Sequence, residues 1–255
     1  AALGVELFFV LSGYLIGTLL IKDIAQNKHF SFAQLKQFLA RRWMRTLPAY
    51  WLVLTILIPI WLIVLKKQLT WKVLLYYVFL QNMVTPHPGF FSVAWSLSVE
   101  EWFYLTLPLC LLIASRNITT INSERWLLRF LLVYMMAAIC LRIGNACLLP
   151  YGTDFDNGIR KMVITRLDAP LYGVIIAWYL YYKPQILHFK SYLLSISVTA
   201  TLLLAALMYY LEPGGQHMHH WFYLPFNTVL VHTLLPIAMA LCLPAAVAYS
   251  NSGKS

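Results

Sequence analysis

Charged residues are scarce in this sequence, and acidic residues are the scarcest of them. Only 11% of the 255 residues are charged, and 9 are aspartate or glutamate. A soluble domain has about 25% charged residues, so this chain has too few to cover a surface that faces water. Hydrophobic residues make up 61%, and the mean hydropathy is +0.70. This composition excludes an ordinary soluble domain and indicates a protein embedded in lipid.

The signatures of several common sites are also absent. The chain has no P-loop, no dinucleotide-binding glycine motif, no G-x-S-x-G and no internal repeat. The net charge of +10 suits anionic lipid headgroups or a polyanionic substrate, but no long basic segment lies outside the apolar runs, so we expect no nucleic acid partner. The cysteines lack metal-ligand spacing, so we expect no metal site and predict four small buried hydrophobic residues: Cys110, Cys140, Cys147 and Cys242.

Hydropathy predicts an all-α, polytopic membrane helix bundle of about eight spanning helices in one domain, residues 1–255. We predict that residues 32–47 form an amphipathic helix along the membrane interface, and that Pro48 separates this helix from the next span. The predicted spans, of which the third is short, are Gly4–Ile21, Ala49–Leu65, Trp71–Val84, Trp95–Ala114, Trp126–Leu149, Leu167–Tyr182, Tyr192–Leu211 and Leu224–Ala248.

The orientation in the membrane does not follow from charge alone. If the loops alternate between the two sides, lysine and arginine divide nine against eight, which decides nothing under the positive-inside rule. The densest cluster, Arg41–Arg45, favours a cytoplasmic position for its own loop.

Two adjacent carboxylates, Glu100 and Glu101, stand near the start of a predicted span. Ser98 and Glu101 fit a capping box, in which the serine caps the helix and the glutamate reaches back to the serine amide. Glu100 projects about 100° away, on the same face as Ser96 and Tyr104. Such a polar stripe within a membrane needs a water-filled cavity or a cationic partner. Glu100 is therefore a candidate functional residue, with a purely structural role as the alternative.

Three arginines lie in the second half of the predicted interfacial helix. Arg42 and Arg45 are three residues apart, and Arg41 and Arg45 are four apart, so pairs of guanidinium groups share a helical face. Two guanidinium groups on one face can hold a phosphate or pyrophosphate. The alternative is that they neutralise lipid phosphates at the interface.

Two further segments combine charge with apolar sequence. Glu6 lies one turn into the first span and is either a site residue or an interfacial one. Ser12 and Gly13 lie in mid-span, where a small residue lets a ligand or another helix approach. Arg166 and Asp168 precede another span, where the aspartate can cap the helix and the pair can form a structural ion pair.

Histidine offers two candidate features. The HMHHW run, residues 217–221, lacks a second group of metal ligands, so we interpret it as a solvated loop. His232 is alone in a predicted span and is a candidate base or helix–helix hydrogen-bond donor. The seven histidines are His29, His87, His188, His217, His219, His220 and His232.

Four segments, taken together, resemble one family. GVELFFVLSGYLIG (Gly4–Gly17), ARRWMRTLPAYW (Ala40–Trp51), WSLSVEEWFYLTLP (Trp95–Pro108) and RLDAPLYGVIIA (Arg166–Ala177) are similar, in order and spacing, to motifs of the acyltransferase 3 family of integral-membrane O-acyltransferases. The resemblance covers essentially the whole chain.

The resemblance implies a ten-helix core with no bound cofactor. It implies that this core transfers an acyl group, usually acetyl, from acyl-CoA to a hydroxyl of a carbohydrate or glycolipid. It also implies a bacterial inner membrane location. Glu100 and Ser12 become the candidate catalytic residues, and the arginine motif the candidate CoA-binding group. Tyr14 matches the S-G-[FY] turn that contains Ser12. The further residues expected to line or support the site are Glu6, Ser96, Ser98, Glu101, Tyr104, Arg166 and Asp168.

The family's first and last helices have no counterpart in this sequence. The chain begins AALGVELFFV, without an initiator methionine, so we interpret it as a fragment. The resemblance then implies a histidine base in a helix upstream of Ala1. Two other hypotheses remain at this point: a transporter or flippase for an acylated or sugar-linked lipid, and a non-catalytic truncated remnant.

Overall fold

The prediction of an all-α polytopic bundle is confirmed. In this computed structural model, six helices are long and apolar enough to cross a membrane, and no strand occurs in the described part of the chain. The chain is a multi-pass integral membrane protein. The described residues are 2–27, 30–66, 68–115, 123–148, 156–210 and 225–252.

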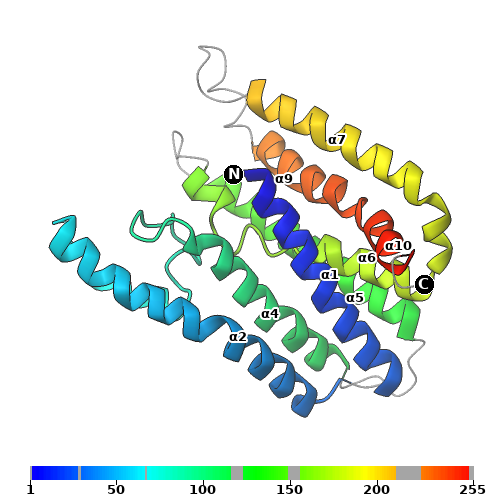
Figure 1. Cartoon of the computed structure of the whole chain (residues 1–255), viewed down its shortest axis with the longest axis horizontal. Coiled ribbons are helices and arrows are strands. Elements are labelled where there is room, and N and C mark those ends of the chain that lie inside the picture. Colours follow the sequence, from blue (N-terminus) through cyan, green and yellow to red (C-terminus); the bar gives the residue numbers. More distant parts are fainter. Residues whose placement is uncertain are drawn as a thin grey trace.

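The long elements lie alongside one another (Figure 1). The main helices are α1 (Ala2–Asn27), α2 (Phe32–Pro59), α4 (Ala94–Ser115), α5 (Ser123–Leu148), α7 (Lys190–Tyr210) and α9 (Pro225–Ala240), which α10 (Leu243–Ser252) follows. The shorter elements are π-helical turns at Ile60–Val64 and Asp156–Arg160, 3₁₀ turns at Trp71–Val73 and Pro184–Phe189, α3 (Leu74–Tyr77) and α6 (Leu171–Tyr182).

Helix α1 is central, and α2 and α7 are peripheral. Within the most apolar stretch of each helix, 50% of the residues of α1 are buried, compared with 11% for α2 and 6% for the segment that contains α7. Figure 1 shows α4 and α2 on one side of α1, and α9 and α7 on the other. Large apolar side chains such as Ile63 and Leu203 are exposed on the outer helices, as expected for surfaces that face lipid.

Helix α1 packs against α6 through direct backbone contact. A Cβ atom added at Gly13 would lie 1.7 Å from the carbonyl oxygen of Pro170, and one at Gly173 would lie 1.9 Å from that of Val10. Gly17, one turn after Gly13, meets Val174 in the same way, at 2.8 Å from its Cα. The Gly13–Gly17 spacing is the G-x-x-x-G pattern of close membrane helix pairs. Gly13 therefore serves helix approach, one of its two predicted roles.

The predicted separation of an interfacial helix from the second span is wrong. Helix α2 runs through Pro48 without a break. A proline inside a membrane helix is tolerated because neighbouring groups satisfy the freed backbone carbonyl. The helix begins after Ser31, which forms a capping box with Gln34: the Gln34 amide donates to the serine hydroxyl (3.3 Å) and the Ser31 amide to the glutamine side chain (2.7 Å).

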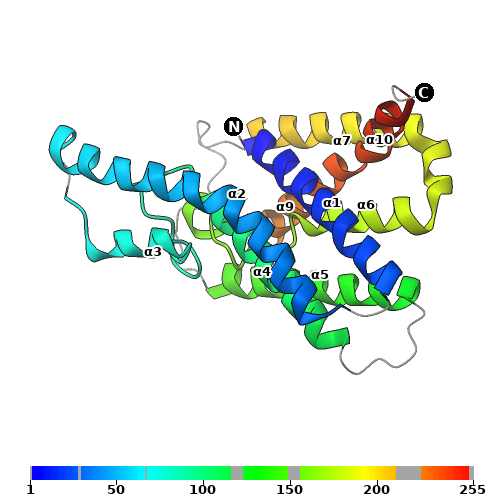
Figure 2. The ribbon, with the colours of Figure 1, turned by 60° about the horizontal axis from the view of Figure 1, so that its bottom comes forward.

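Residues 71–84, predicted as a span, do not form one. They fold into the 3₁₀ turn, the four-residue α3 and further turns, which lie below the far part of α2 in Figure 2. Side chains of α2 satisfy the carbonyls at the end of α3: Tyr50 donates to that of Tyr76, and Trp51 donates to that of Tyr77. Because these carbonyls have partners, the helix can end without exposing unsatisfied backbone groups to lipid.

Three other details differ from prediction. Helix α6 begins at Leu171 instead of Leu167, and the last predicted span breaks between α9 and α10, just before Pro244, which cannot donate to a helical hydrogen bond. Among the remaining predicted spans, Gly4–Ile21 and Trp95–Ala114 lie within α1 and α4, and Ala49–Leu65 covers the end of α2 and the π-helical turn that follows it. The described residues of Trp126–Leu149 and Tyr192–Leu211 lie within α5 and α7. The prediction of buried cysteines is wrong: Cys110, Cys140 and Cys147 are exposed, and Cys242 is half-buried. The reason is that an apolar side chain in a membrane protein can face lipid.

We expect Gly13→Ala to destabilise the bundle, because the new methyl group would overlap the Pro170 carbonyl. Overpacking of this kind costs about 1–3 kcal/mol. The measurement is the thermal unfolding midpoint of the purified protein in detergent. Gly144→Ala is the matched control, since nothing lies within 4 Å of its added Cβ. Equal midpoints for the two variants would contradict the close contact.

Candidate active site

Glu100 lies inside the bundle, where α4 faces α1 and α2. The residue is 3% exposed. Its carboxylate interacts with the hydroxyls of Ser12 on α1 and Tyr104 on α4, and with the guanidinium of Arg42 on α2. One oxygen, Oε1, has no hydrogen-bond partner among the described residues. The candidate catalytic residues Glu100 and Ser12 are therefore neighbours, and one buried carboxylate oxygen has no partner among the described residues.

Arg42 is the arginine that faces this carboxylate. Its guanidinium carbon lies 4.8 Å from the centroid of the Tyr104 ring, a cation–π arrangement. Arg42 is half-buried, whereas Arg41 and Arg45 are exposed. The guanidinium of Arg42 therefore lies toward α4, while Arg41 and Arg45 are exposed on α2.

The predicted capping box at Ser98 and Glu101 is wrong, because α4 begins at Ala94, one turn earlier. The Ser98 hydroxyl donates to the Ala94 carbonyl (3.0 Å) and accepts from the side-chain amide of Gln81. Glu101 instead reaches across to α2, where its Oε1 accepts from the Thr46 hydroxyl at 3.0 Å. Both side chains are buried, and both residues lie within α4 and not at its start.

The predicted polar stripe on α4 is shorter than expected. Ser96 donates to the carbonyl of Val93 at 3.3 Å, in the first turn of the helix. The polar groups around Glu100 come instead from three helices.

Tyr14, one turn from Gly17, packs against the apolar clusters that surround α1 and α6.

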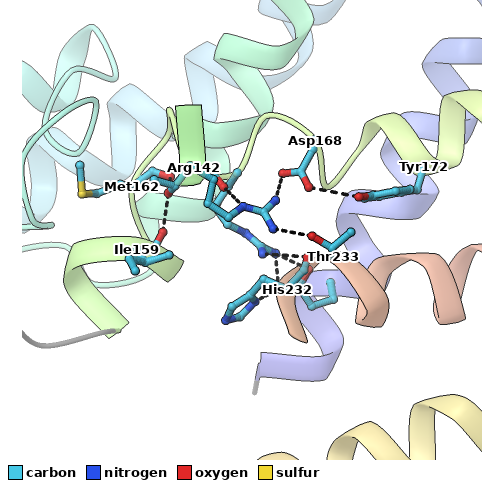
Figure 3. A network of polar contacts seen from close by, with 10 residues as sticks. Arg142, Ile159, Met162, Asp168, Tyr172, His232 and Thr233 are labelled. Atoms are coloured by element: carbon cyan, nitrogen blue, oxygen red, sulfur yellow. Dashed lines mark hydrogen bonds and ion pairs between the residues drawn. The ribbon is translucent and has the colours of Figure 1, made fainter. Parts of the chain in front are cut away.

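A second buried polar cluster lies where α1, α5, α9 and the turn before α6 meet (Figure 3). Arg166 forms an ion pair with Glu6, and Arg142 forms one with Asp168. The predicted Arg166–Asp168 pair is therefore wrong, because each residue pairs with a partner from another element. Asp168 also does not cap α6, whose N-cap position is Pro170 and carries no side-chain cap.

Further hydrogen bonds hold the Arg142–Asp168 pair. Arg142 donates to the Thr165 carbonyl at 2.7 Å and to the Thr233 hydroxyl at 3.1 Å. The Tyr172 hydroxyl donates to the second oxygen of Asp168 at 3.3 Å (Figure 3). Excellent geometry and full hydrogen bonding are what a buried ion pair needs to offset desolvation.

His232 belongs to this cluster. The sequence suggested a residue alone in its span, but in the structure His232 has neighbours on other elements. Its Nδ1 lies 3.7 Å from Glu6 Oε1, and its backbone carbonyl accepts from Arg166 at 3.5 Å. It joins α9 to α1 and to the turn before α6, which matches its predicted role in helix–helix contacts. The HMHHW run, residues 217–221, lies outside the described residues.

The two clusters share α1 and differ in charge balance. The cluster at Glu6 contains two guanidinium groups and two carboxylates, all buried. At Glu100, two carboxylates, Glu100 and Glu101, meet the single guanidinium of Arg42. The first cluster is internally neutral and suits a structural role. The second has unsatisfied carboxylate oxygens and suits a polar ligand.

Sequence reasoning missed several members of these clusters. Arg142 had a usable signal, because a charge inside an apolar span is expensive unless it has a partner or a function. Thr46 and Tyr172 had no such signal in the sequence, since a hydroxyl in an apolar run commonly bonds within its own helix.

Comparison with known proteins decides the family. Residues 1–251 match the family model of an acyltransferase domain. The chain belongs to the acyltransferase 3 family. A Staphylococcus aureus (strain COL) protein provisionally named as an O-acetyltransferase is 30% identical over 193 residues, and O-acetyltransferase OatA of Staphylococcus aureus (strain NCTC 8325 / PS 47) is 26% identical over 189 residues.

Each of these two alignments includes 69% of this chain and 30% of the relative. The chain therefore corresponds to less than a third of the length of these acyltransferase 3 relatives. No solved structure matches the chain.

We expect Glu6→Gln to destabilise this acyltransferase 3 bundle by about 3–5 kcal/mol, because it leaves the buried Arg166 without its counter-charge. The thermal unfolding midpoint in detergent measures the effect. The double variant Glu6→Leu/Arg166→Met should recover most of the loss, since removal of both charges of a buried pair is often neutral.

Glu124→Gln is the matched control, because Glu124 forms an exposed pair with Lys183 at 2.8 Å and exposed pairs contribute about 0–1 kcal/mol. A Glu6→Gln midpoint no lower than that of the control would contradict the structural role of the ion pair.

Proposed function

We propose that the chain forms the membrane core of an enzyme that transfers an acyl group, usually acetyl, from acyl-CoA to a hydroxyl of a carbohydrate or surface glycoconjugate at the bacterial inner membrane. The observation that carries the proposal is the meeting of Arg42, Glu100, Ser12 and Tyr104 within the bundle. Membership of the acyltransferase 3 family and the O-acetyltransferase names of the relatives support it.

The reaction requires few groups. The acceptor hydroxyl oxygen attacks the thioester carbonyl carbon, a C–O bond forms, the C–S bond breaks, and the hydroxyl proton passes to a base and then to the CoA thiolate. A positioned base typically contributes 10²–10⁴-fold. The Oε1 atom of Glu100, which has no hydrogen-bond partner among the described residues, can hold the acceptor hydroxyl.

The hydroxyls near Glu100 share one proposed task. Ser12 donates to the Phe9 carbonyl at 2.9 Å and also interacts with Glu100. Tyr104 stacks with Arg42 and interacts with the same carboxylate. We assign Ser12 and Tyr104 to positioning of Glu100.

The arginines are the proposed phosphate-binding group. Arg41 and Arg45 are exposed on α2, on either side of the half-buried Arg42. Exposed guanidinium groups on a membrane helix need anionic partners, and CoA phosphates are such partners. Arg42 would then connect the phosphate-binding side of α2 with Glu100.

We expect Glu100→Gln in the full-length protein to lower the rate of acyl transfer by about 10²-fold or more, because the amide cannot carry the negative charge. The measurement is acyl-CoA-dependent acylation of the cell-surface glycan, with membrane insertion checked on the same cells. Glu124→Gln, the same substitution on α5, should retain activity. Glycan acylation at the normal rate in Glu100→Gln would remove this residue from the mechanism.

We expect Arg42→Ala to raise the KM for acyl-CoA about tenfold or more, since a hydrogen bond to a charged group contributes about 1.5–3 kcal/mol. Initial rates over a range of acyl-CoA concentrations give the KM. The control is Lys36→Ala, which removes an exposed cation from the same helix. If the acyl-CoA saturation curve of Arg42→Ala matched that of the control, Arg42 would not bind the donor.

A further inference from the structure

A cavity of about 240 Å³ opens between α2, α4 and residues 77–79. Aromatic rings form most of its wall, and a single carboxylate contributes to it. The lining residues that matter here are Trp43, Trp51, Tyr77, Phe79, Glu101 and Trp102.

The aromatic walls of this cavity are held in place by backbone hydrogen bonds. The indole of Trp51 donates to the Tyr77 carbonyl (3.1 Å), and that of Trp102 donates to the Phe79 carbonyl (2.9 Å). Phe79 has a φ of 57°, a conformation that bulky residues rarely adopt, and its ring stacks on Tyr50 with the centroids 4.7 Å apart. Because both indole N–H groups are occupied, these side chains offer a ligand mainly apolar ring surface.

Glu101 is the polar feature of the cavity. Its Oε1 accepts from Thr46, but its Oε2 is buried and has no hydrogen-bond partner among the described residues. An unsatisfied buried oxygen carries a free-energy cost, which is larger when the atom is charged. A ligand that donates a hydrogen bond to Glu101 would recover this free energy.

These features limit the chemistry of the ligand. A phosphate or carboxylate would be repelled by Glu101, and a plain hydrocarbon chain would leave Oε2 unsatisfied. Arg42 already acts on the Glu101 carboxylate, so a second cation is not required. A neutral ring with apolar C–H faces and hydroxyl donors satisfies both the aromatic walls and the carboxylate, and sugars have this combination.

We propose that this cavity is the acceptor-sugar subsite, in which one pyranose ring stacks on the tryptophans and donates a hydroxyl hydrogen bond to Glu101. The assignment of the sugar as acceptor rests on the proposed function. Pockets for drug-sized ligands have volumes of about 300–1,000 Å³, so the cavity suits a single ring. Glu101 follows Glu100 on α4, so the cavity and the candidate catalytic carboxylate are one residue apart on the same helix.

Saturation-transfer difference NMR on the full-length protein in nanodiscs tests the proposal. The probes are the methyl glycosides of glucose, galactose and N-acetylglucosamine. We expect saturable transfer to the ring C–H protons of at least one probe. Glu101→Gln and Trp51→Leu should each raise its Kd about tenfold or more, because each removes one of the two proposed contacts.

Matched controls separate a local effect from a general one. Trp71→Leu removes an exposed tryptophan outside the cavity, and Glu124→Gln removes a carboxylate on α5; both should leave the Kd unchanged. Glu101→Gln preserves shape, so it remains informative if Trp51→Leu unfolds. Thermal unfolding midpoints show which variants are folded.

Three results would overturn the subsite. The first is no saturable transfer to any of the three glycosides. The second is transfer with the same Kd in Glu101→Gln and in the controls. The third is a raised KM for acyl-CoA in Glu101→Gln with unchanged glycoside binding, which would assign the cavity to the donor. None of these results depends on the glycan-acylation assay of Glu100→Gln, so the subsite and the proposed function can fail separately.

Discussion

The contact between the backbones of α1 and α6 is the constraint on which both polar clusters depend. Gly13 and Gly173 have no side chains, and the two helices approach until carbonyl groups lie where methyl groups would otherwise be. This contact fixes the position of α1 along its axis. Glu6 then lies opposite Arg166, and Ser12, adjacent to the contact, lies opposite Glu100. A shift of α1 by one residue, about 1.5 Å, would displace both pairs of groups together.

The two polar clusters show how a membrane protein can use charge in two ways. Around Glu6, two cations and two anions from different elements neutralise one another, and the hydrogen bonds of Thr165, Thr233 and Tyr172 complete the network. Around Glu100, the carboxylates outnumber the cation and retain oxygens without partners. Because a charge in a low-dielectric interior is expensive without a counter-charge, the second arrangement favours a protonated carboxyl group or a polar guest that donates to the free oxygens.

The sequence allowed prediction of the helices better than of their ends and partners. Hydropathy located α1, α4, α5 and α7 because the membrane demands long apolar helices. The interpretation of Pro48 as a boundary and of Ser98–Glu101 as a capping box used rules for helices in water, and both were wrong. Inside the bundle, neighbouring side chains take the place of water, so a helix can continue through a proline and a serine in its interior can bond to the preceding turn.

The candidate site was predictable only as a set of residues. Glu100, Ser12 and the arginine motif were identified, but their grouping was not, because it depends on contacts between segments far apart in sequence. The pairings of Arg166 with Glu6 and of Arg142 with Asp168 join residues 160 and 26 positions apart. Local spacing suggested the pair Arg166–Asp168 instead. No local pattern in one chain distinguishes these alternatives.

The indole hydrogen bonds at the end of α3 have a consequence for how ligands enter. Trp51 from α2 and Trp102 from α4 are both attached to the same short stretch, residues 77–79, and Tyr50 adds a third attachment at Tyr76. Lipid cannot replace these hydrogen bonds, so parting α2 from α4 would break them without compensation. The two helices and residues 77–79 are therefore held together, and a ligand reaches the cavity between them through its existing opening, without the parting of α2 from α4.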